Sequence, residues 1–306
     1  MGNMEKSDSL VTVLMPVFNG GADLRLAIDS ILNQSYSHFE FLIIDDGSTD
    51  ESAQLIASYA DDRIRFLQNF QNMGLVATLN RGIDEARGTY IARMDADDVS
   101  LPSRLATQVA LLEQGPPEDP GDIGGSYFEV ISETGALIRT LSSPLTTEGV
   151  IACLANTVPF AHGSVMLRTA FLNEHQLRYR PEADAEDFDL WVRIFEAGGK
   201  FVNSKQVLYQ YRDYDSSLSK TKAKEMEQWA KKLRRQFVAR NLKVCQDALK
   251  TLLPSQSSLE YRDQLNLICL AFRVGSISGK WSPYLRALVQ ASPKAIAHST
   301  YRLLRA

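Results

Sequence analysis

The chain has 306 residues, of which 44% are hydrophobic and 23% charged, and its formal net charge is -4 at pH 7. This length admits one large α/β domain with an extension, or two domains. The composition is that of a soluble globular protein, and the negative net charge argues against nucleic acid as a partner. Its three cysteines lie far apart and fit neither a disulfide framework nor a metal-knuckle spacing, so we expect buried thiols in a reducing compartment.

The two ends of the chain differ in charge. The first nine residues have no apolar core that could act as a signal peptide, and no uncharged run is long enough to span a bilayer, so we expect a cytoplasmic protein. After Asp263 there is no acidic residue, while several basic residues remain, which predicts a basic C-terminal surface. These are Arg273, Lys280, Arg286, Lys294, Arg302 and Arg305.

The first part of the chain alternates apolar runs with segments of helical periodicity. Strands are predicted at 11–15, 39–44, 63–67 and 90–94, and helices at 22–33, 48–59, 74–86 and from Pro102 onward. This alternation predicts a parallel sheet with crossover helices, which binds ligands beyond the carboxyl ends of its strands. Phe18, Asp46 and the acids that begin at Asp95 follow three of these strands.

The pattern changes after a proline-rich loop that begins near Gln114. Further strands are predicted at 123–131, 136–141, 163–167 and 206–212. Helices are predicted at 146–155 and from Ala185 to the glycine pair at 198–199. A polar loop follows at 213–220. From residue 221 onward the sequence is typical of helices, broken into at least three pieces by Pro254 and Pro283.

Asp95, Asp97 and Asp98 occupy three of four consecutive positions just past an apolar strand. Such close carboxylates repel one another unless a cation or a hydrogen-bond network holds them. Acids at i and i+2 can turn toward one hard divalent ion such as Mg²⁺ or Mn²⁺, the usual partner of a diphosphate. The alternative is an acidic turn. We expect Asp98 to be structural, either capping the helix at Pro102 or accepting from a backbone amide.

Three other nucleotide or phosphate folds fit less well. A Rossmann dehydrogenase needs G-x-G-x-x-G after its first strand, where this chain has P-V-F-N-G-G. A receiver domain carries an acid pair like Asp45-Asp46, but it is much shorter and would leave the second acid cluster unexplained. A nucleotidyltransferase needs a basic phosphate loop, and the loop after the first strand contains no Lys or Arg.

Five motifs in order resemble the family 2 glycosyltransferases: V-T-V-L-M-P-V-F-N, F-L-I-I-D-D-G-S-T-D, N-M-G-L-V-A-T-L-N-R-G-I, Y-I-A-R-M-D-A-D-D and A-E-D-F-D-L-W. They cover about residues 10 to 215 and look most like bacterial enzymes of capsule, O-antigen or exopolysaccharide synthesis. The resemblance implies an α/β GT-A fold, Rossmann-like, with a mostly parallel central sheet and flanking helices. This domain would span 1–220, with a nucleotide-sugar half at about 10–115 and an acceptor half at about 116–220. A helical C-terminal extension would follow at 221–306.

The resemblance also implies a role for individual residues. Asp95 and Asp97 form the D-x-D motif around Ala96, with Asp97 the direct ligand of the Mn²⁺ or Mg²⁺ that bridges the donor's phosphates. Asp187 matches the family's general base, and Glu186 would orient it or contact the acceptor. The uracil and ribose of a UDP-sugar would contact Pro16, Phe18, Asn19 and Asp46.

Other positions match the family less closely. Asn80 is among the nearest matches to a nucleotide contact after the third strand. Arg93 either pairs with one of the acids or reaches the diphosphate. Tyr214 stands where the family often has a His that holds the leaving diphosphate. His162 and Ser164 line the acceptor side or belong to the core, and Trp191 is a core residue or an acceptor platform.

The function that the resemblance implies is inverting, metal-dependent transfer of a hexosyl or N-acetylhexosaminyl group. The donor would be a UDP-sugar, and the acceptor a hydroxyl of a glycan or lipid-linked saccharide in capsule or lipopolysaccharide synthesis. The alternative is a catalytically inactive, nucleotide-sugar-binding scaffold. The presence of Asp95, Asp97 and Asp187 argues against it, since a binder needs no base.

Apolar side chains interleave with the basic residues near the C-terminus, a pattern typical of a helix that lies on an anionic membrane. We therefore expect peripheral contact with the inner face of the cytoplasmic membrane. A helical cap on the catalytic domain or a homodimer interface is the alternative. The apolar residues are Trp281, Tyr284, Leu285, Leu288, Tyr301, Leu303 and Leu304.

Overall fold

The computed structural model describes residues 8–113, 121–214, 223–259, 261–296 and 299. The chain forms two compact units. The first comprises Met1–Ser143, Phe160–Glu182 and Arg193–Ser217, and the second comprises Pro144–Pro159, Ala183–Val192 and Leu218–Ala306. The loop expected after Gln114, most of the loop at 213–220, and the apolar and basic residues from 301 to 305 lie outside the described residues.

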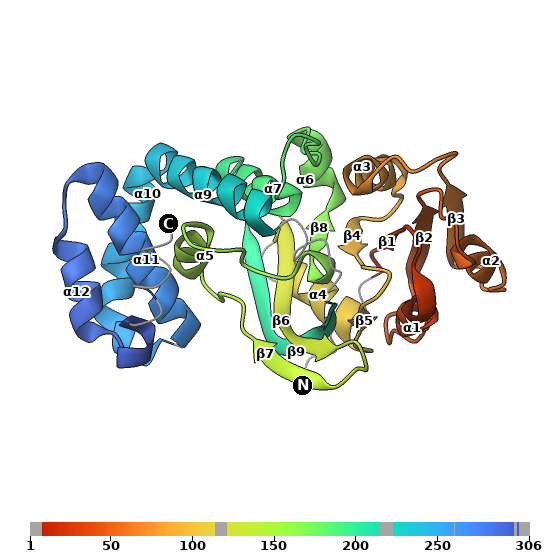
Figure 1. The fold of residues 1–306 in the computed structure, drawn as a ribbon, viewed down its shortest axis with the longest axis horizontal. Helices are drawn as coiled ribbons and strands as arrows, with labels where there is room; N and C mark the ends of the chain where they lie inside the picture. Colours follow the sequence, from red (N-terminus) through yellow and green to blue (C-terminus); the bar gives the residue numbers. More distant parts are fainter. Residues whose placement is uncertain (1–7, 114–120, 215–222, 260, 297–298, 300–306) are drawn as a thin grey trace. The chain divides into compact units, whose positions relative to one another are not determined.

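The first unit is built on one sheet, which has nine strands within the described ranges (Figure 1). Its order is β3-β2-β1-β4-β8-β6-β9-β5, with β7 paired to β6. The strands are β1 (Val11–Val17), β2 (Phe39–Asp45), β3 (Ile64–Gln68), β4 (Tyr90–Arg93), β5 (Val99–Ser100), β6 (Ile123–Ser132), β7 (Leu137–Leu141), β8 (Met166–Arg168) and β9 (Phe201–Asp213). Pairing from β3 through β2 and β1 to β4 is parallel.

The helices of the first unit follow the strands in the order expected for crossover connections. They are η1 (Gly21–Asp23), α1 (Leu24–Leu32), α2 (Ser52–Ala57), α3 (Leu75–Glu85), α4 (Arg104–Leu112), η2 (His162–Ser164) and α6 (Thr169–Glu174). Buried apolar side chains of β1, β2, β4, α1 and α4 share one core cluster. The predicted α/β class and the parallel sheet with crossover helices are confirmed.

The second unit is helical. It contains α5 (Thr147–Leu154), α9 (Ala223–Arg240), α10 (Leu242–Leu252), η3 (Leu253–Ser258), α11 (Tyr261–Ser278) and α12 (Ser282–Gln290). Helix α7 (Glu186–Glu196) begins in this unit and ends in the first. Inside the second unit, α5 packs on α10 and α11, and Asn156, two residues after the end of α5, donates a buried hydrogen bond to Asn266 of α11 (2.7 Å). Cys153, Cys245 and Cys269 are buried thiols, as predicted.

Several predicted boundaries differ from the structure. The first strand continues through Pro16 to Val17, because a strand can hold a proline where the missing N–H is not needed for pairing. Pro254 and Pro283 occupy the first turns of η3 and α12, so these prolines begin helices and the breaks precede them. Strand β5 and helix α6 were not predicted, since segments this short have no usable periodicity.

No helix in the described part of the chain is both long enough and apolar enough to cross a bilayer.

Thr12 is a buried hydroxyl at the start of the β1–β4 pairing. Its Oγ1 donates to Glu40 Oε1 (2.6 Å) and accepts from the N–H groups of Gly88 (2.8 Å) and Arg87 (3.2 Å). Thr12→Val keeps the shape but leaves the buried N–H of Gly88 without its partner, whereas the N–H of Arg87 keeps Glu40 Oε1 (2.8 Å), so we expect the variant to lower the free energy of unfolding by about 1–3 kcal/mol. Thr12→Ser, which keeps the hydroxyl, is the control and should lose less. Denaturant titration of both variants checks this, and a Val variant as stable as the Ser variant would contradict it.

Candidate active site

Three strands of the parallel half deliver the predicted donor-site residues to one edge of the sheet. β1 pairs with β2 on one side and with β4 on the other, all in parallel, so their carboxyl ends meet at the same edge. Phe18 follows β1, Asp46 follows β2, and the segment Met94–Asp98 follows β4. The structure therefore brings these side chains to the edge where sheets of this kind bind ligands.

Asp46 organises the loop that leads into α3. Its carboxylate is buried and accepts from the backbone N–H groups of Met73 (2.8 Å) and Gly74 (2.8 Å) and from Asn69 Nδ2 (2.6 Å). Both carboxylate oxygens are thus in use, and Asp46 fixes the loop at the edge of the sheet. Its predicted contact with the nucleotide stays a prediction.

Gly47 lets that loop approach closely. Its φ is 74°, and a Cβ there would lie 2.6 Å from the carbonyl carbon of Gln71 and 2.7 Å from the nitrogen of Asn72. A side chain would therefore push the loop away from the end of β2. This close approach explains why a glycine follows Asp45 and Asp46 in the sequence.

Asn19 joins the loops that follow β1 and β2. Its Oδ1 accepts from the N–H of Thr49 (2.8 Å), and its own N–H donates to Ser48 Oγ (2.9 Å). The ring of Phe18 beside it is 48% exposed, whereas Pro16 lies within β1 and is buried. Phe18 therefore offers an exposed aromatic ring at this edge.

Asn80 holds a different segment of the first unit. Its Nδ2 donates to the carbonyl of Tyr179 and its Oδ1 accepts from the N–H of the same residue, both at 2.8 Å. The amide thus clamps the backbone at Tyr179 to helix α3. Its predicted nucleotide contact stays a prediction.

Arg93 and Asp95 form an ion pair at the end of β4. Arg93 is only 3% exposed. The N–H of Asp95 donates to Tyr209 Oη of β9 (3.2 Å), and a Cβ on Gly163 would lie 2.7 Å from Asp95 Oδ2. Strand β9 therefore contacts the backbone of Asp95, and η2 lies close to its carboxylate. Of the two predicted roles of Arg93, the structure shows the pairing with an acid.

Asp98 is the structural member of the acid cluster. It is 1% exposed, and its Oδ1 accepts from the backbone N–H of Arg212 in β9 (2.7 Å). Of the two structural roles expected for it, the backbone-amide contact is the one observed. Burial, together with the charge of the neighbouring Asp97, raises the pKa of Asp98 to about 7. The carboxyl is thus close to the balance between its neutral and charged forms near neutral pH.

Arg212 ties the acid cluster to distant parts of the unit. Its Nε donates to the carbonyl of Asp97 (2.9 Å), and its Nη1 donates to the carbonyl of Glu133 at the β6–β7 turn (3.0 Å). Its Nη2 forms an ion pair with Asp23 of η1 (3.3 Å). The Tyr214 hydroxyl donates to the other oxygen of Asp23. The sequence did not predict a role for Asp23, because its partners, Arg212 and Tyr214, lie far from it along the chain and no local motif marks it.

Asp97 is the second acid of the D-x-D motif. Its side chain is half-buried. Burial raises the pKa of Asp97, and the charge of Asp23 raises it further, while Arg93 and Arg212 lower it. A carboxylate that is partly desolvated beside other acids is a position that a cation would stabilise.

Glu186 and Asp187 lie in the first turn of α7, in the second unit. Both side chains are half-buried. Asp187 Oδ1 accepts from the N–H of Phe188 (2.7 Å), and Trp191 one turn on is fully buried, which makes it a core residue. The approach of Asp187 to the acids of the first unit stays a prediction.

The side chains of His162 and Ser164 both form hydrogen bonds within the first unit. His162 Nε2 shares a hydrogen bond with Tyr179 Oη (2.8 Å). Ser164 is fully buried, and its hydroxyl donates to the carbonyl of Ala161 (2.8 Å). Ser164 therefore belongs to the core, and a role for His162 toward an acceptor stays a prediction.

The chain is similar to proteins of one enzyme family. The sequence signature of Glycosyl transferase family 2 matches residues 12–175. EpsE of Bacillus subtilis (strain 168) is 38% identical over 208 residues, which cover 66% of this chain and 73% of EpsE. WfgD of Escherichia coli, named a UDP-Glc:alpha-D-GlcNAc-diphosphoundecaprenol beta-1,3-glucosyltransferase, is 27% identical over 232 residues, which cover 72% of this chain and 85% of WfgD.

Solved structures share the fold. S. aureus TarS, in complex with UDP-GlcNAc, matches with a TM-score of 0.60 and 17% identity over 96% of this chain and 87% of its own. The mannosyltransferase PcManGT from Pyrobaculum calidifontis, in complex with GDP-Man and Mn²⁺, matches with a TM-score of 0.56 and 17% identity over 96% of this chain and 84% of its own. At this identity the likeness shows the fold alone, and it confirms the predicted GT-A class.

Burial lowers the pKa of His162 well below its ordinary value of 6.5, and the charge of Arg93 lowers it further. The unfolded chain binds a proton as the pH falls through about 6.5 while the native imidazole stays neutral, so this residue lowers stability below that pH. Between about pH 7 and about pH 5 we expect the wild type to lose up to about 2 kcal/mol more free energy of unfolding than His162→Gln. Denaturant titration at each pH measures the difference.

Tyr179→Phe is the matched control for this prediction. It removes the hydrogen-bond partner of His162 but keeps the buried imidazole. This variant should therefore retain the pH dependence of the wild type. Equal slopes for the wild type and His162→Gln would contradict a neutral buried imidazole.

Proposed function

The chain belongs to glycosyl transferase family 2 and is a glycosyltransferase, and from this premise we propose that it moves a hexosyl or N-acetylhexosaminyl group from a UDP-sugar to an acceptor hydroxyl, with inversion at the anomeric carbon. Membership of an enzyme family does not favour the inactive scaffold that was the alternative. The observation that carries the donor side of the proposal is the convergence of Asp95 and Asp97 at the end of β4, next to the strand ends that bear Phe18 and Asp46.

The acids of this edge fit a hard divalent cation that is shared with the donor. The described residues contain no group of three or more His, Cys, Asp or Glu that could hold a metal by itself. Mg²⁺ and similar ions are, however, commonly held by one or two carboxylates together with substrate phosphates and water. Asp97, with its pKa raised by burial and by Asp23, is the ligand that would gain most from a cation. Asp95 is held by Arg93 and would be the second.

The residues at this edge of the sheet have separate roles in the proposal. A divalent ion bound at Asp97 would neutralise charge on the departing diphosphate. The exposed ring of Phe18 offers a stacking surface for the base. Asn19 and Asp46 hold the surrounding loops in place before the donor binds. The resulting site is organised in advance, which lowers the entropic cost of positioning the donor.

Asp187 is the proposed general base. The acceptor oxygen attacks the anomeric carbon while the bond from that carbon to the diphosphate breaks, and the hydroxyl proton passes to the Asp187 carboxylate. The nucleoside diphosphate leaves from the opposite face of the sugar, which inverts the anomeric centre. Glu186, its neighbour in the first turn of α7, would orient the base or contact the acceptor.

The acceptor is proposed to be a glycan or a lipid-linked saccharide in surface polysaccharide synthesis. WfgD, whose name specifies a UDP-Glc donor and a diphosphoundecaprenol-linked acceptor, supports both the UDP-sugar and the lipid-linked acceptor. A similar O-antigen glycosyltransferase, WbnJ of Escherichia coli, supports the polysaccharide setting. The proposed sites of action are the cytoplasm and the inner face of the cytoplasmic membrane. Peripheral membrane contact or homodimerisation through the C-terminal helices stays a proposal.

Asp187→Asn should lower kcat for sugar transfer by about 10²–10⁴-fold, because the amide cannot take the proton of the acceptor hydroxyl. The KM for the donor should change little, since the base acts on the acceptor. The measurement is release of UDP from a UDP-sugar panel in the presence of Mn²⁺ and an extract of lipid-linked saccharides. Asp184→Asn, an exposed acid in the segment before α7, is the matched control and should leave kcat unchanged. A similar kcat for Asp187→Asn and the wild type would exclude this residue as the base.

Asp97→Asn should remove the Mn²⁺-dependent part of donor binding. A ligand at about 100 times its Kd stabilises the folded state by about 2.7 kcal/mol, which raises the Tm by several degrees. We expect a UDP-sugar with Mn²⁺ to produce such a shift in the wild type and in the exposed-acid control Asp62→Asn. In Asp97→Asn the shift should be no larger than that with the nucleotide sugar alone. A full Mn²⁺-dependent shift in Asp97→Asn would show that the ion binds elsewhere.

A further inference from the structure

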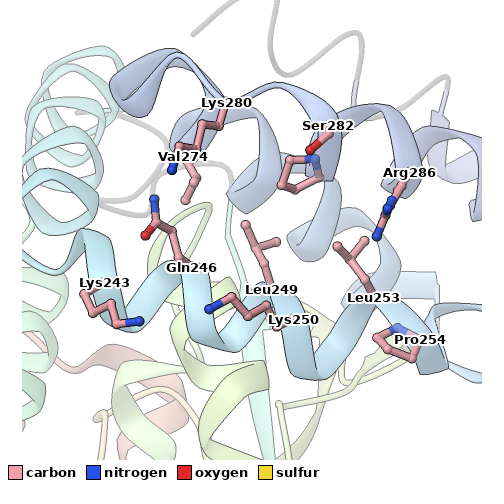
Figure 2. Close-up of a pocket in the computed structure, with 11 residues that line it drawn as sticks. Lys243, Gln246, Leu249, Lys250, Leu253, Pro254, Val274, Lys280, Ser282 and Arg286 are labelled. Carbon is pink, nitrogen blue, oxygen red and sulfur yellow. The ribbon is translucent and has the colours of Figure 1, made fainter.

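A basic cavity of about 500 Å³ lies within the second unit (Figure 2). Its walls come from α10, η3, the end of α11 and the start of α12. Leu249 of α10 and Val274 of α11 line it and are each 1% exposed. Four cationic side chains also line it: Lys243, Lys250, Lys280 and Arg286. The cavity therefore combines an apolar interior with exposed positive charge.

The positive charge is only partly balanced. No Asp or Glu is among the residues that line the cavity. Asp247 on α10 pairs with Lys250 (2.8 Å) and Lys243 (3.3 Å), so one carboxylate serves two ammonium groups. Among the described residues, neither Lys280 nor Arg286 forms an ion pair, and both side chains are exposed. These two cations are the ones that remain available to an anion.

The first turn of α12 adds a second feature that favours an anion. Ser282 and Pro283 line the cavity, and Pro283 lies in that turn. The turn contains no acidic residue, and the Trp281 side chain at the N-cap makes no capping hydrogen bond. Free N–H groups and the positive end of the helix dipole at such a terminus attract phosphate oxygens. The hydroxyl of Ser282 can donate to the same oxygens.

Exposed apolar side chains stand beside the lining residues in the sequence. Trp281, between Lys280 and Ser282, is 42% exposed, and Leu285, next to Arg286, is 59% exposed. The Trp281 ring also packs edge-on against Phe272, with ring centroids 5.6 Å apart, so it is held in place. An indole ring with apolar neighbours and nearby cations is typical of residues at a membrane–water interface.

We propose that this cavity binds the phosphate headgroup of an anionic lipid, with Lys280 and Arg286 as the main contacts and the α12 N-terminus beside them. The inference deepens the peripheral membrane contact proposed above and rests on it, but not on the sugar-transfer chemistry. A soluble nucleotide fits less well, because no aromatic ring lines the cavity on which a base could stack. Of the possible phosphate carriers, an amphiphile also makes use of the exposed Trp281 and Leu285.

Flotation of the full-length protein with phosphatidylglycerol or phosphatidylcholine vesicles tests the site. We expect binding to phosphatidylglycerol only. Each cation near an anionic surface contributes about five-fold in partitioning, so Lys280→Ala/Arg286→Ala should weaken binding by about 25-fold. The matched control, Lys224→Ala/Arg235→Ala, removes the same charges from exposed positions on α9 and should weaken binding by no more than about two-fold. Lys280→Arg/Arg286→Lys keeps the charges and should bind like the wild type.

Three results would overturn the proposal. An equal loss in the cavity variant and the α9 variant would show a diffuse basic surface with no defined site. Equal binding to both kinds of vesicle would show that binding does not depend on the net negative charge of the lipid. A Tm rise with pyrophosphate that the cavity variant abolishes, without vesicle binding, would assign the cavity to a soluble phosphate. Because all three readouts are binding measurements, UDP release by the same preparations reports separately on the proposed transferase activity.

Discussion

The guanidinium of Arg212 holds the candidate active site together. It reaches the acid cluster after β4, the turn between β6 and β7, and the 3-10 helix after β1, while its backbone N–H is bound by the buried Asp98. A single buried cation thus fixes segments that the sequence places far apart. Replacing such a group would leave several carbonyl and carboxylate oxygens without their partner, which is costly in a buried environment.

The charges around Arg212 do not cancel. Arg93 and Arg212 face Asp23, Asp95 and Asp97, and Asp98 adds a further carboxyl with its pKa raised to about 7. Arg93 and Arg212 therefore face three carboxylates in a partly desolvated place, while the buried Arg104 interacts with the charge of Asp98. The excess negative charge destabilises the protein alone and becomes favourable when a cation binds. This imbalance makes the acid-rich loop at the edge of the sheet a favourable place for a cation.

Local pattern predicted the parallel half of the first unit well, for a physical reason. Strands such as Val11–Val17 and Phe39–Asp45 are buried on both faces, so they appear as continuous apolar runs between polar turns. The edge at which ligands bind follows directly from that order of strands. The order of the motifs along the chain then predicted that the acids after β4 belong to the donor site.

What local pattern could not predict depends on long-range contacts. Strand β5 has two residues and exists because it pairs with β9. The side chains of Asp46, Asn19 and Asn80 are each engaged by backbone groups of other loops, which no spacing rule reveals. These three side chains therefore hold loops of the first unit in place. Among the predicted donor-site residues, Phe18 has an exposed side chain and Asp97 a half-buried one.

In the C-terminal region, the sequence predicted a basic face without showing where its charges would gather. The helical packing brings Lys243 and Lys250 from α10 close to the same cavity as Lys280 and Arg286, which flank the start of α12 (Figure 2). Asp247 offsets the α10 pair, so the unbalanced charge lies at the α12 end, where the helix N-terminus adds to it. A uniformly basic helix would attract any anionic surface, whereas charge gathered around an apolar cavity favours a phosphate attached to an apolar chain. The second unit thereby acquires a binding preference that its composition alone does not specify.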